Sequence, residues 1–367
     1  DGHRAIWLQE IDIASGKPFG PRKVLIDGGV KPEENPIWIE GPHIYKVDGW
    51  YYLSNAEGGT GPQHSQVVLR SRDVWGPYEP YARNPILTQR DLDPKRELPI
   101  TNAGHADLVQ GPDGSWWATF LASRNYGVDH YNTGREAFLL PVTWKDGWPV
   151  ILPPGERIPY VLPGPSFMRK PADQAPMTGN FTWRDEFDTV GLGKGWMTPR
   201  VPKTPWYDGS SRPGWLAIRP LPERLDAKTN MAFYARRQQH LVFEASTAME
   251  LPAPGVAAGL AAFQGDDHWY FLGVRRGSGE GVEVFLEKKA GDGEVEVVAS
   301  QPATGVERLT LHIKGDEGAY GFGFDAGNGQ GVRWLAEDAD GTILSTDVAG
   351  GFIGATLGPH ARIEAAR

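Results

Sequence analysis

The sequence predicts an all-β protein in which a propeller-like portion is followed by a β-sandwich. Short aromatic runs flank Asp-Gly turns at residues 45–56, 109–123 and 142–151, and such turns are a strong signal for β-hairpins. The 47 Gly and 31 Pro residues are spread along the chain, as many strands joined by turns require. No segment keeps a capped apolar period of 3.6 residues, which argues against long helices.

The chain of 367 residues is long enough for two domains. Residues 1–163 carry the repeated hairpins, beginning with a strand at Ala5–Ile13 and a turn at Ser15-Gly16-Lys17, and such repetition favours propeller blades. Residues 164–180 are rich in Pro and polar side chains, which indicates an interdomain linker. From 181 to 367, alternating strands divided by Gly and Asp turns predict an antiparallel β-sandwich.

The composition favours a neutral sugar-like ligand. A net charge of −9 without a long basic run disfavours nucleic acid or an acidic membrane as a partner. The 14 Trp and 12 Tyr residues suit sugars, whose C–H faces stack on aromatic rings. The absence of cysteine excludes disulfides, thiolate metal sites and a Cys nucleophile, and no stretch is long and apolar enough to span a membrane. Composition leaves the compartment and the oligomeric state open, a homo-oligomer included.

Glu40 is the strongest candidate for chemistry. It follows Ile37-Trp38-Ile39, which predicts an aromatic strand ending at the acid, and it precedes a predicted turn at Gly41-Pro42. A solvated strand-end carboxylate is the plainer interpretation. However, apolar and aromatic neighbours that exclude water would suit this carboxyl group to general acid catalysis.

Two further residues are candidates for ligand binding. His105 lies in a stretch of small residues that leaves room for a ligand or an ion, although a buried, hydrogen-bonded histidine is the commoner explanation. Arg135 precedes an apolar strand, where an inward guanidinium needs a partner such as a polyol or a carboxylate. A surface salt bridge is the alternative for Arg135. The acids Asp107, Asp113, Asp146, Asp185, Glu186 and Asp188 are interpreted as turn or strand-end residues, the last three with calcium binding as the alternative.

The missing motifs narrow the chemistry to carboxylates. The sequence contains no G-x-S-x-G, no H-E-x-x-H and no phosphate-binding Gly loop. Hydrolysis of a glycosidic bond needs a pair of carboxylates, one acting as acid and the other as base or nucleophile.

Four segments together resemble the second half of a family 43 glycoside hydrolase propeller. They are EGPHIYKVDGWYYLSNAEGGT from residue 40, HSQVVLRSRDVWGPYE from 64, NAGHADLV from 102 and TGREAFLLPVTWKDGWP from 133. FYARRQQHLVF and GGFIGATLGPHARI are similar to the C-terminal β-sandwich of the β-xylosidase/α-L-arabinofuranosidase branch. The resemblance implies a five-bladed propeller that cleaves with inversion, and it requires no cofactor.

The resemblance also implies roles for five residues. Glu40 matches the general acid, and Arg135 matches an arginine that contacts the sugar. His105 matches a histidine near the propeller axis that in some members holds a water or a structural calcium ion. Thr60 lies in a loop similar to a substrate-contacting loop. Phe352 resembles an aromatic residue that the sandwich inserts at the rim of the pocket, which closes the pocket for exo action.

The catalytic base and the aspartate that tunes the acid match positions that precede Asp1. We therefore expect a separate N-terminal segment to complete the propeller, and activity only in its presence. The leading hypothesis is an exo-acting, inverting glycosidase that releases xylose or arabinose from short oligosaccharides, without a choice between the two sugars. One alternative is a non-catalytic carbohydrate-binding protein. The other is a retaining fructan- or sucrose-cleaving enzyme, although such enzymes carry a Cys after their acid and this chain has none.

Overall fold

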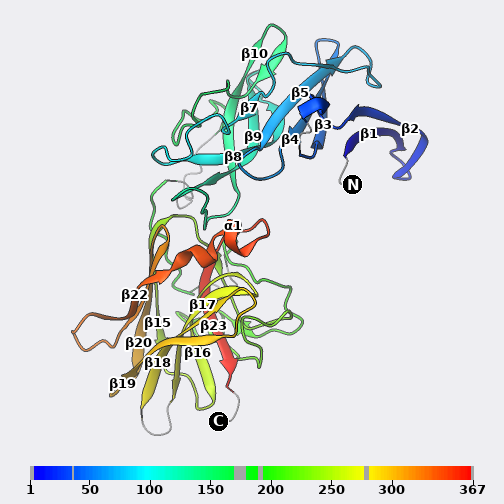
Figure 1. Ribbon diagram of the computed structural model, residues 1–367. Helices are drawn as coiled ribbons and strands as arrows, with labels where there is room; N and C mark the ends of the chain where they lie inside the picture. The colour runs from blue at the N-terminus through cyan, green and yellow to red at the C-terminus, as the bar shows by residue number, and fades with distance from the viewer. Residues whose placement is uncertain (1–3, 35–36, 169–178, 189–192, 277–280, 365–367) are drawn as a thin grey trace. The chain divides into compact units, whose positions relative to one another are not determined.

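The computed structural model describes residues 4–34, 37–168, 179–188, 193–276 and 281–364, and nearly every regular element in them is a strand (Figure 1). The all-β prediction is confirmed. Contacts divide the chain into two units, one made of Asp1–Val128 and Arg135–Ala172, the other of Asp129–Gly134 and Asp173–Arg367. Residues 169–178 of the predicted linker lie outside the described residues. No helix in the described ranges is long and apolar enough to cross a membrane.

The described part of the first unit forms three antiparallel sheets. Its elements are β1 Ala5–Asp12, β2 Lys17–Asp27, η1 Pro32–Glu34, β3 Glu40–Val47, β4 Trp50–Glu57, β5 Ser65–Ser71, β6 Glu79–Pro80, β7 Leu87–Thr88, β8 Ile100–Gln110, β9 Trp116–Arg124, β10 Glu136–Lys145 and β11 Trp148–Val150. β1 pairs with β2, the second sheet has the order β3-β4-β5-β6 with β7 also on β5, and the third has the order β11-β10-β9-β8.

The predicted Asp-Gly hairpins are confirmed. Asp48 and Gly49 join β3 to β4 with φ values of 49° and 75°, and Asp146 and Gly147 join β10 to β11 with 51° and 74°. Positive φ at both central residues matches the twist of the strands they connect, and Asp-Gly adopts it readily. The turn between β8 and β9 is held by Asp113, whose Oδ1 accepts hydrogen bonds from the backbone N and the Oγ of Ser115.

The predicted strand over Ile37–Ile39 is wrong. Trp38 has a φ of 41°, which an extended strand does not allow. Its side chain is 44% exposed, whereas Ile39 is 2% exposed and packs in a small core beneath β4 and β5. Only one residue of the aromatic run is therefore a core residue, and the strand begins after it.

Gly41-Pro42 is not a turn, as the sequence had predicted, but lies inside β3. Pairing of β3 with β4 shifts between Glu40 and His43, which is the signature of a β-bulge. Gly41 supplies the positive φ of 58° that this bulge uses. Glu40 consequently opens its strand at a kink.

A buried amide ties the second sheet to the third. Gln66, fully buried on β5, donates from Nε2 to Ser54 Oγ on β4 at 2.8 Å and accepts at Oε1 from the backbone N of Ala106 on β8 at 2.9 Å. On another part of β3, the hydroxyl of Tyr45 accepts a hydrogen bond from the backbone N of Leu108 at 2.9 Å. These bonds fix β8 against the sheet that carries Glu40.

In its described residues, the second unit forms a sandwich of a six-stranded sheet and a four-stranded sheet, together with a separate two-stranded sheet. Its elements are β12 Tyr207–Asp208, β13 Ala217–Ile218, β14 Arg236–Arg237, β15 Val242–Glu250, β16 Val256–Gly265, β17 His268–Arg276, β18 Val282–Ala290, β19 Glu296–Ala303, β20 Arg308–Asp316, β21 Ala319–Asp325, β22 Val332–Asp340, η2 Gly341–Leu344, α1 Thr346–Ala349 and β23 Thr356–Ile363. The orders in the sandwich are β14-β23-β16-β17-β18-β19 and β15-β20-β21-β22, and β12 pairs with β13 in the separate sheet. Alternate residues such as Leu272, Leu311 and Phe322 form the core between the sheets.

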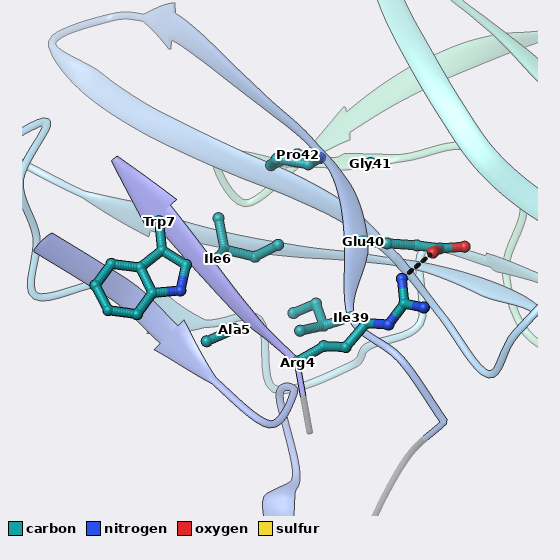
Figure 2. Close-up of a pocket in the computed structure, with 8 residues that line it drawn as sticks. All are labelled: Arg4, Ala5, Ile6, Trp7, Ile39, Glu40, Gly41 and Pro42. Atoms are coloured by element: carbon teal, nitrogen blue, oxygen red, sulfur yellow. Dashed lines mark hydrogen bonds and ion pairs between the residues drawn. The ribbon is translucent and has the colours of Figure 1, made fainter. Parts of the chain in front are cut away.

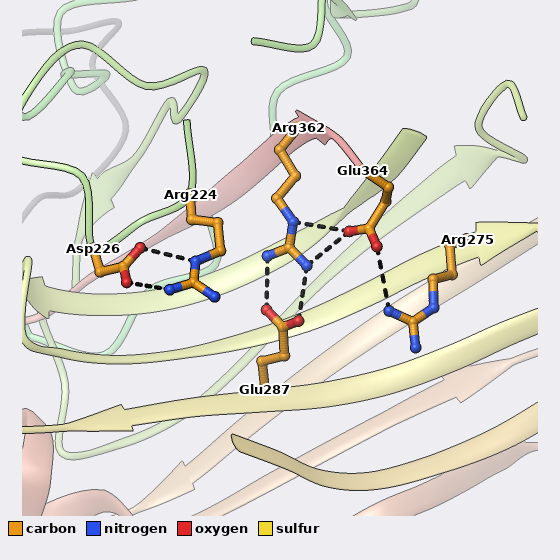
Figure 3. Close-up of polar contacts among 6 residues, drawn as sticks. All are labelled: Arg224, Asp226, Arg275, Glu287, Arg362 and Glu364. Carbon is orange, nitrogen blue, oxygen red and sulfur yellow. Dashed lines mark hydrogen bonds and ion pairs between the residues drawn. The ribbon is translucent and has the colours of Figure 1, made fainter. Parts of the chain in front are cut away.

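The opposite face of the six-stranded sheet is also covered. Phe233 and Met231 pack there against Phe271 and Phe285. Beside this apolar layer lies a network of ion pairs around Arg362 (Figure 3). Both faces of this sheet are thus covered, and one of them also carries paired charges.

Candidate active site

Glu40 lines a cavity of about 450 Å³ (Figure 2). The other lining residues are Arg4–Trp7, Ile39, Gly41 and Pro42. This volume lies within the range of small-molecule sites. The Glu40 side chain is 26% exposed, and its Oε2 lies 3.3 Å from Nη1 of Arg4. The Arg4 guanidinium in turn lies 4.3 Å from the centre of the Trp38 ring. Glu40 is therefore a half-buried, ion-paired acid at the wall of a cavity.

The ring of His105 lies against Gly41, the residue that follows Glu40. A Cβ atom on Gly41 would stand 2.5 Å from Nε2 of His105, so only glycine allows this approach. His105 and Asn102 have φ values of 57° and 59°, and the pairing of β8 with β9 shifts on both sides of Gly104. Positive φ is uncommon for residues other than glycine and clusters at functional sites. The structure thus brings together two residues, Glu40 and His105, that the sequence analysis had singled out separately.

A second histidine, His64, completes this group, and the sequence analysis assigned it no role. It is 1% exposed, and its ring centre lies 6.5 Å from that of His105. Its Nδ1 donates to the backbone O of Asn102 at 2.8 Å, which leaves Nε2 as an acceptor. Nε2 of His64 and Nδ1 of His105 are buried without a hydrogen-bond partner among the described residues. One histidine before an apolar strand carries no specific sequence signal, so only its neighbours in space reveal it.

The charges of the predicted site residues converge on His64. Burial lowers the pKa of His64 below its usual range, and the positive charges of His105 and Arg135 act in the same direction. The carbonyl of Asn102 and the negative charge of Glu40 oppose this shift. His64 is therefore neutral at neutral pH, a polar acceptor rather than a cation.

Arg135 acts electrostatically on His64, and Thr60 lies in the loop between β4 and β5. Arg135 directly precedes β10, whose first residue, Glu136, forms a two-point ion pair with Arg124 on β9 at 2.8 and 2.7 Å. The start of the loop that contains Thr60 is anchored by a hydrogen bond of 2.7 Å from the backbone N of Gly58 to the O of Ile37. The contacts predicted for Arg135 and Thr60 with a sugar stay predictions.

Phe352 belongs to the second unit. Its side chain is 60% exposed, and it follows Gly351, which has a φ of 75°. The next residue, Ile353, forms an isolated bridge with Gly134. The prediction that Phe352 closes a sugar pocket stays a prediction.

The residues around His105 do not form a calcium site by themselves. Calcium takes six to eight oxygen ligands. In the described ranges, no three or more His, Asp or Glu side chains converge in a way that would hold a metal ion. Calcium binding through a water at His105 stays a prediction.

Comparison with known proteins assigns the family. The model of glycosyl hydrolases family 43 matches residues 1–149, and the model of the beta xylosidase C-terminal Concanavalin A-like domain matches residues 184–363. A solved structure described as a GH43_12 from a capybara gut metagenome is 32% identical, with a TM-score of 0.84, over 98% of this chain and 67% of its own. The chain belongs to glycoside hydrolase family 43.

Family 43 membership confirms the resemblance seen in the sequence. It also confirms the predicted fold, because the solved relatives are five-bladed propellers followed by a β-sandwich. A xylosidase/arabinosidase of Butyrivibrio fibrisolvens is 35% identical over 75% of this chain and 52% of its own length. A non-reducing end alpha-L-arabinofuranosidase of Bacteroides ovatus is 36% identical over 66% and 45%. This family 43 chain spans about half the length of the curated relatives it matches.

Proposed function

We propose that this chain carries the acid half of an exo-acting, inverting glycosidase that releases xylose or arabinose from the ends of short oligosaccharides. The observation that carries the proposal is the position of Glu40, a half-buried carboxylate at the wall of a cavity, next to Gly41, which lies against His105. The names of the family 43 relatives, which include both xylosidases and arabinosidases, support the choice of sugars.

In the proposed reaction, Glu40 donates its proton to the glycosidic oxygen as the bond to the anomeric carbon breaks. A second carboxylate takes a proton from the water that attacks the opposite face of that carbon. The two carboxyl groups of an inverting enzyme stand roughly 6.5–9.5 Å apart, so that this water fits between them. Arg135 would bind the hydroxyls of the sugar, and neutral His64 would supply a polar wall without competing for the proton.

We infer that the second carboxylate lies on residues outside this sequence, on a segment that completes the propeller and is needed for activity. The lengths of the relatives support this inference. So does the surface of the hairpin β1–β2, where Trp7, Ile11 and Phe19 are 59%, 58% and 51% exposed. Several large apolar side chains exposed on one hairpin are a common mark of a surface that another segment covers.

One observation favours a second candidate function, that of a non-catalytic carbohydrate-binding protein. Oε2 of Glu40 is engaged by Arg4 at 3.3 Å, so this oxygen is occupied and cannot approach a glycosidic bond. Catalysis at Glu40 therefore requires that Arg4 release it in the complete enzyme.

The experiment uses the full-length protein that contains this chain. Purified protein is mixed with xylobiose or with an arabinofuranosyl oligosaccharide, and proton NMR follows the anomer that forms first. An inverting xylosidase releases α-xylose from a β-linkage, and Glu40→Gln should abolish the signal, whereas Glu250→Gln, on an exposed strand of the sandwich, should not. Release of β-xylose from a β-xyloside, or of α-arabinose from an α-arabinofuranoside, would rule out inversion. Binding of the oligosaccharide by calorimetry without any hydrolysis would establish the second candidate instead.

A further inference from the structure

The segment Asp129–Gly134 belongs to the second unit, although the residues before and after it in the chain belong to the first. It lies between β9 and β10 in the sequence, and it ends at the peptide bond to Arg135. Its contacts are therefore with the sandwich, while the residue that follows it is the proposed sugar-binding arginine.

The side chain of Asn132 is the centre of this attachment. Asn132 is fully buried, and its Nδ2 donates to the hydroxyl of Tyr320 at 3.1 Å and to the backbone O of Gly341 at 2.8 Å. Its backbone O accepts from the backbone N of Ala355 at 2.8 Å. A buried amide whose donors are both satisfied is specific, because a side chain of the same shape without donors leaves the acceptors unsatisfied.

The pocket that receives Asn132 is built for an amide donor. Tyr320 is fully buried on β21, and its hydroxyl donates to Oε1 of Gln238 at 2.6 Å, so its oxygen faces Asn132 as an acceptor. Burial raises the pKa of Tyr320 to about 12, so the hydroxyl keeps its proton at neutral pH. The donors in this series of hydrogen bonds are therefore fixed: Asn132 donates to Tyr320, and Tyr320 donates to Gln238.

Backbone contacts on both sides of Asn132 hold the rest of the segment. The backbone N of Tyr131 donates to Oγ of Ser345 at 2.7 Å. Gly134, with a φ of 69°, bridges Ile353, and a Cβ atom on Gly134 would stand 2.2 Å from the backbone N of Gly354. The segment is therefore pressed against the sandwich, backbone to backbone, up to the residue before Arg135.

We propose that Asn132 is a positioning residue for Arg135: the pocket of Tyr320 and Gln238 in the sandwich fixes the backbone from which the arginine reaches the sugar. This inference rests on the proposed role of Arg135 in sugar binding. It gives the sandwich a part in substrate affinity that does not depend on Phe352. The constraint passes along the covalent chain, because Glu136 is held in β10 on the other side of Arg135.

The test compares Asn132→Asp and Tyr320→Phe with wild type in the full-length enzyme. Asp keeps the shape of Asn but cannot donate to Tyr320 or Gly341. With 4-nitrophenyl β-D-xylopyranoside or 4-nitrophenyl α-L-arabinofuranoside, Asn132→Asp should raise KM by roughly 10- to 100-fold, the range expected when a substrate-positioning group moves by about 1 Å. Tyr320→Phe should act in the same direction but less strongly.

The matched control is Gln301→Glu, another amide-to-acid change in the sandwich. Nε2 of Gln301 donates to the backbone O of Trp334 at 3.1 Å, on the edge strand β22 and not on the segment Asp129–Gly134. The KM of Gln301→Glu should match that of wild type.

A double-mutant comparison separates positioning from general damage. In the Arg135→Ala background, Asn132→Asp should raise KM by less than about twofold, because its effect passes through the missing arginine. An equal rise in both backgrounds would overturn the proposal, and so would an unchanged KM in a folded Asn132→Asp protein.

Hydrogen exchange tests the anchor without using activity. Backbone amides of residues 129–138 should exchange faster in Asn132→Asp than in wild type and should be unchanged in Gln301→Glu. Unchanged exchange in Asn132→Asp would refute the anchor. A KM that Arg135→Ala leaves unchanged would refute the sugar contact instead, so the two failures are distinguishable.

Discussion

Gly41 lies against the imidazole of His105 so closely that a Cβ atom would stand 2.5 Å from Nε2. Gly41 also has a φ of 58°, which disfavours any other residue. We expect Gly41→Ala to lower the free energy of unfolding by about 2 kcal/mol or more, because it combines backbone strain with a clash inside a packed region. Urea denaturation of the full-length protein measures this change.

The matched control for Gly41→Ala is Gly164→Ala, because a Cβ atom there meets nothing within 4 Å and φ is not positive. This variant should unfold at the same urea concentration as wild type or slightly higher. Equal effects of the two substitutions would show that the contact between Gly41 and His105 does not constrain β3.

Glu40→Ala should affect substrates according to their leaving group. A poor leaving group such as a sugar alkoxide must be protonated as it departs, and general acid catalysis typically contributes about 10²–10⁴-fold. We therefore expect kcat/KM to fall by that factor for a natural disaccharide. Activity on a nitrophenyl glycoside, whose phenolate leaves unaided, should largely persist. Arg135→Ala should weaken both substrates alike, because its role is to bind the sugar. Equal losses on both substrates in Glu40→Ala would mean that Glu40 is not the acid.

Acid should destabilise the sandwich through His360. This histidine is fully buried beside Phe271, and its Nδ1 bonds the backbone O of Ala232 at 2.9 Å. Burial lowers the pKa of His360 from 6.5 to about 3. Below pH 6.5 His360 binds a proton in the unfolded chain but stays neutral in the folded protein. The contribution of neutral His360 to the free energy of unfolding is therefore fully present above pH 6.5 and is lost as the pH falls toward 3. The loss should be about 1.4 kcal/mol per pH unit in that window.

The measurement for His360 is the free energy of unfolding between pH 7 and pH 4. His360→Gln keeps a hydrogen-bond donor but does not titrate, so its stability should fall less steeply than that of wild type. His312→Gln, at a half-buried position on β20, serves as the control and should keep the wild-type slope. Parallel curves for wild type and His360→Gln would contradict the prediction.

Two ion pairs of the sandwich should differ sharply in their contribution to stability. Arg362 and Glu287 form a two-point pair at 2.7 and 2.8 Å with side chains only 5% and 7% exposed (Figure 3). Glu287→Ala should cost about 3 kcal/mol, the lower end of the range for breaking a buried pair, because Glu364 still contacts Arg362.

Arg212 and Glu250 form a pair of the same geometry at 2.7 and 2.8 Å, with side chains 50% and 43% exposed. Water solvates both groups whether or not they pair, so Glu250→Ala should leave the unfolding midpoint within experimental error. Calorimetry of both variants tests the contrast. Similar shifts in melting temperature would show that burial does not decide the value of these pairs.

The hairpins and the all-β class were predictable from the sequence because they depend on neighbours along the chain. Asp48-Gly49 has an intrinsic preference for positive φ. The turn and the two strands beside it can therefore be predicted from a few residues. The same local logic failed at Trp38 and Gly41. There the backbone bends into a bulge because β3 must pair with β4 while it approaches the ring of His105, and no residue near position 40 indicates that contact.

The tertiary structure alone decided which polar residues come together in this fold. His64 stands before an ordinary apolar strand, and only its bond to Asn102 and its contact with His105 make it part of a site. Asn132 has the sequence context of a surface loop, yet it is buried by Tyr320 and Gly341, 188 and 209 residues away along the chain. Strand and turn preferences depend on a few neighbouring residues and can be predicted from them. The partner of a buried hydrogen-bond donor depends instead on how distant segments pack.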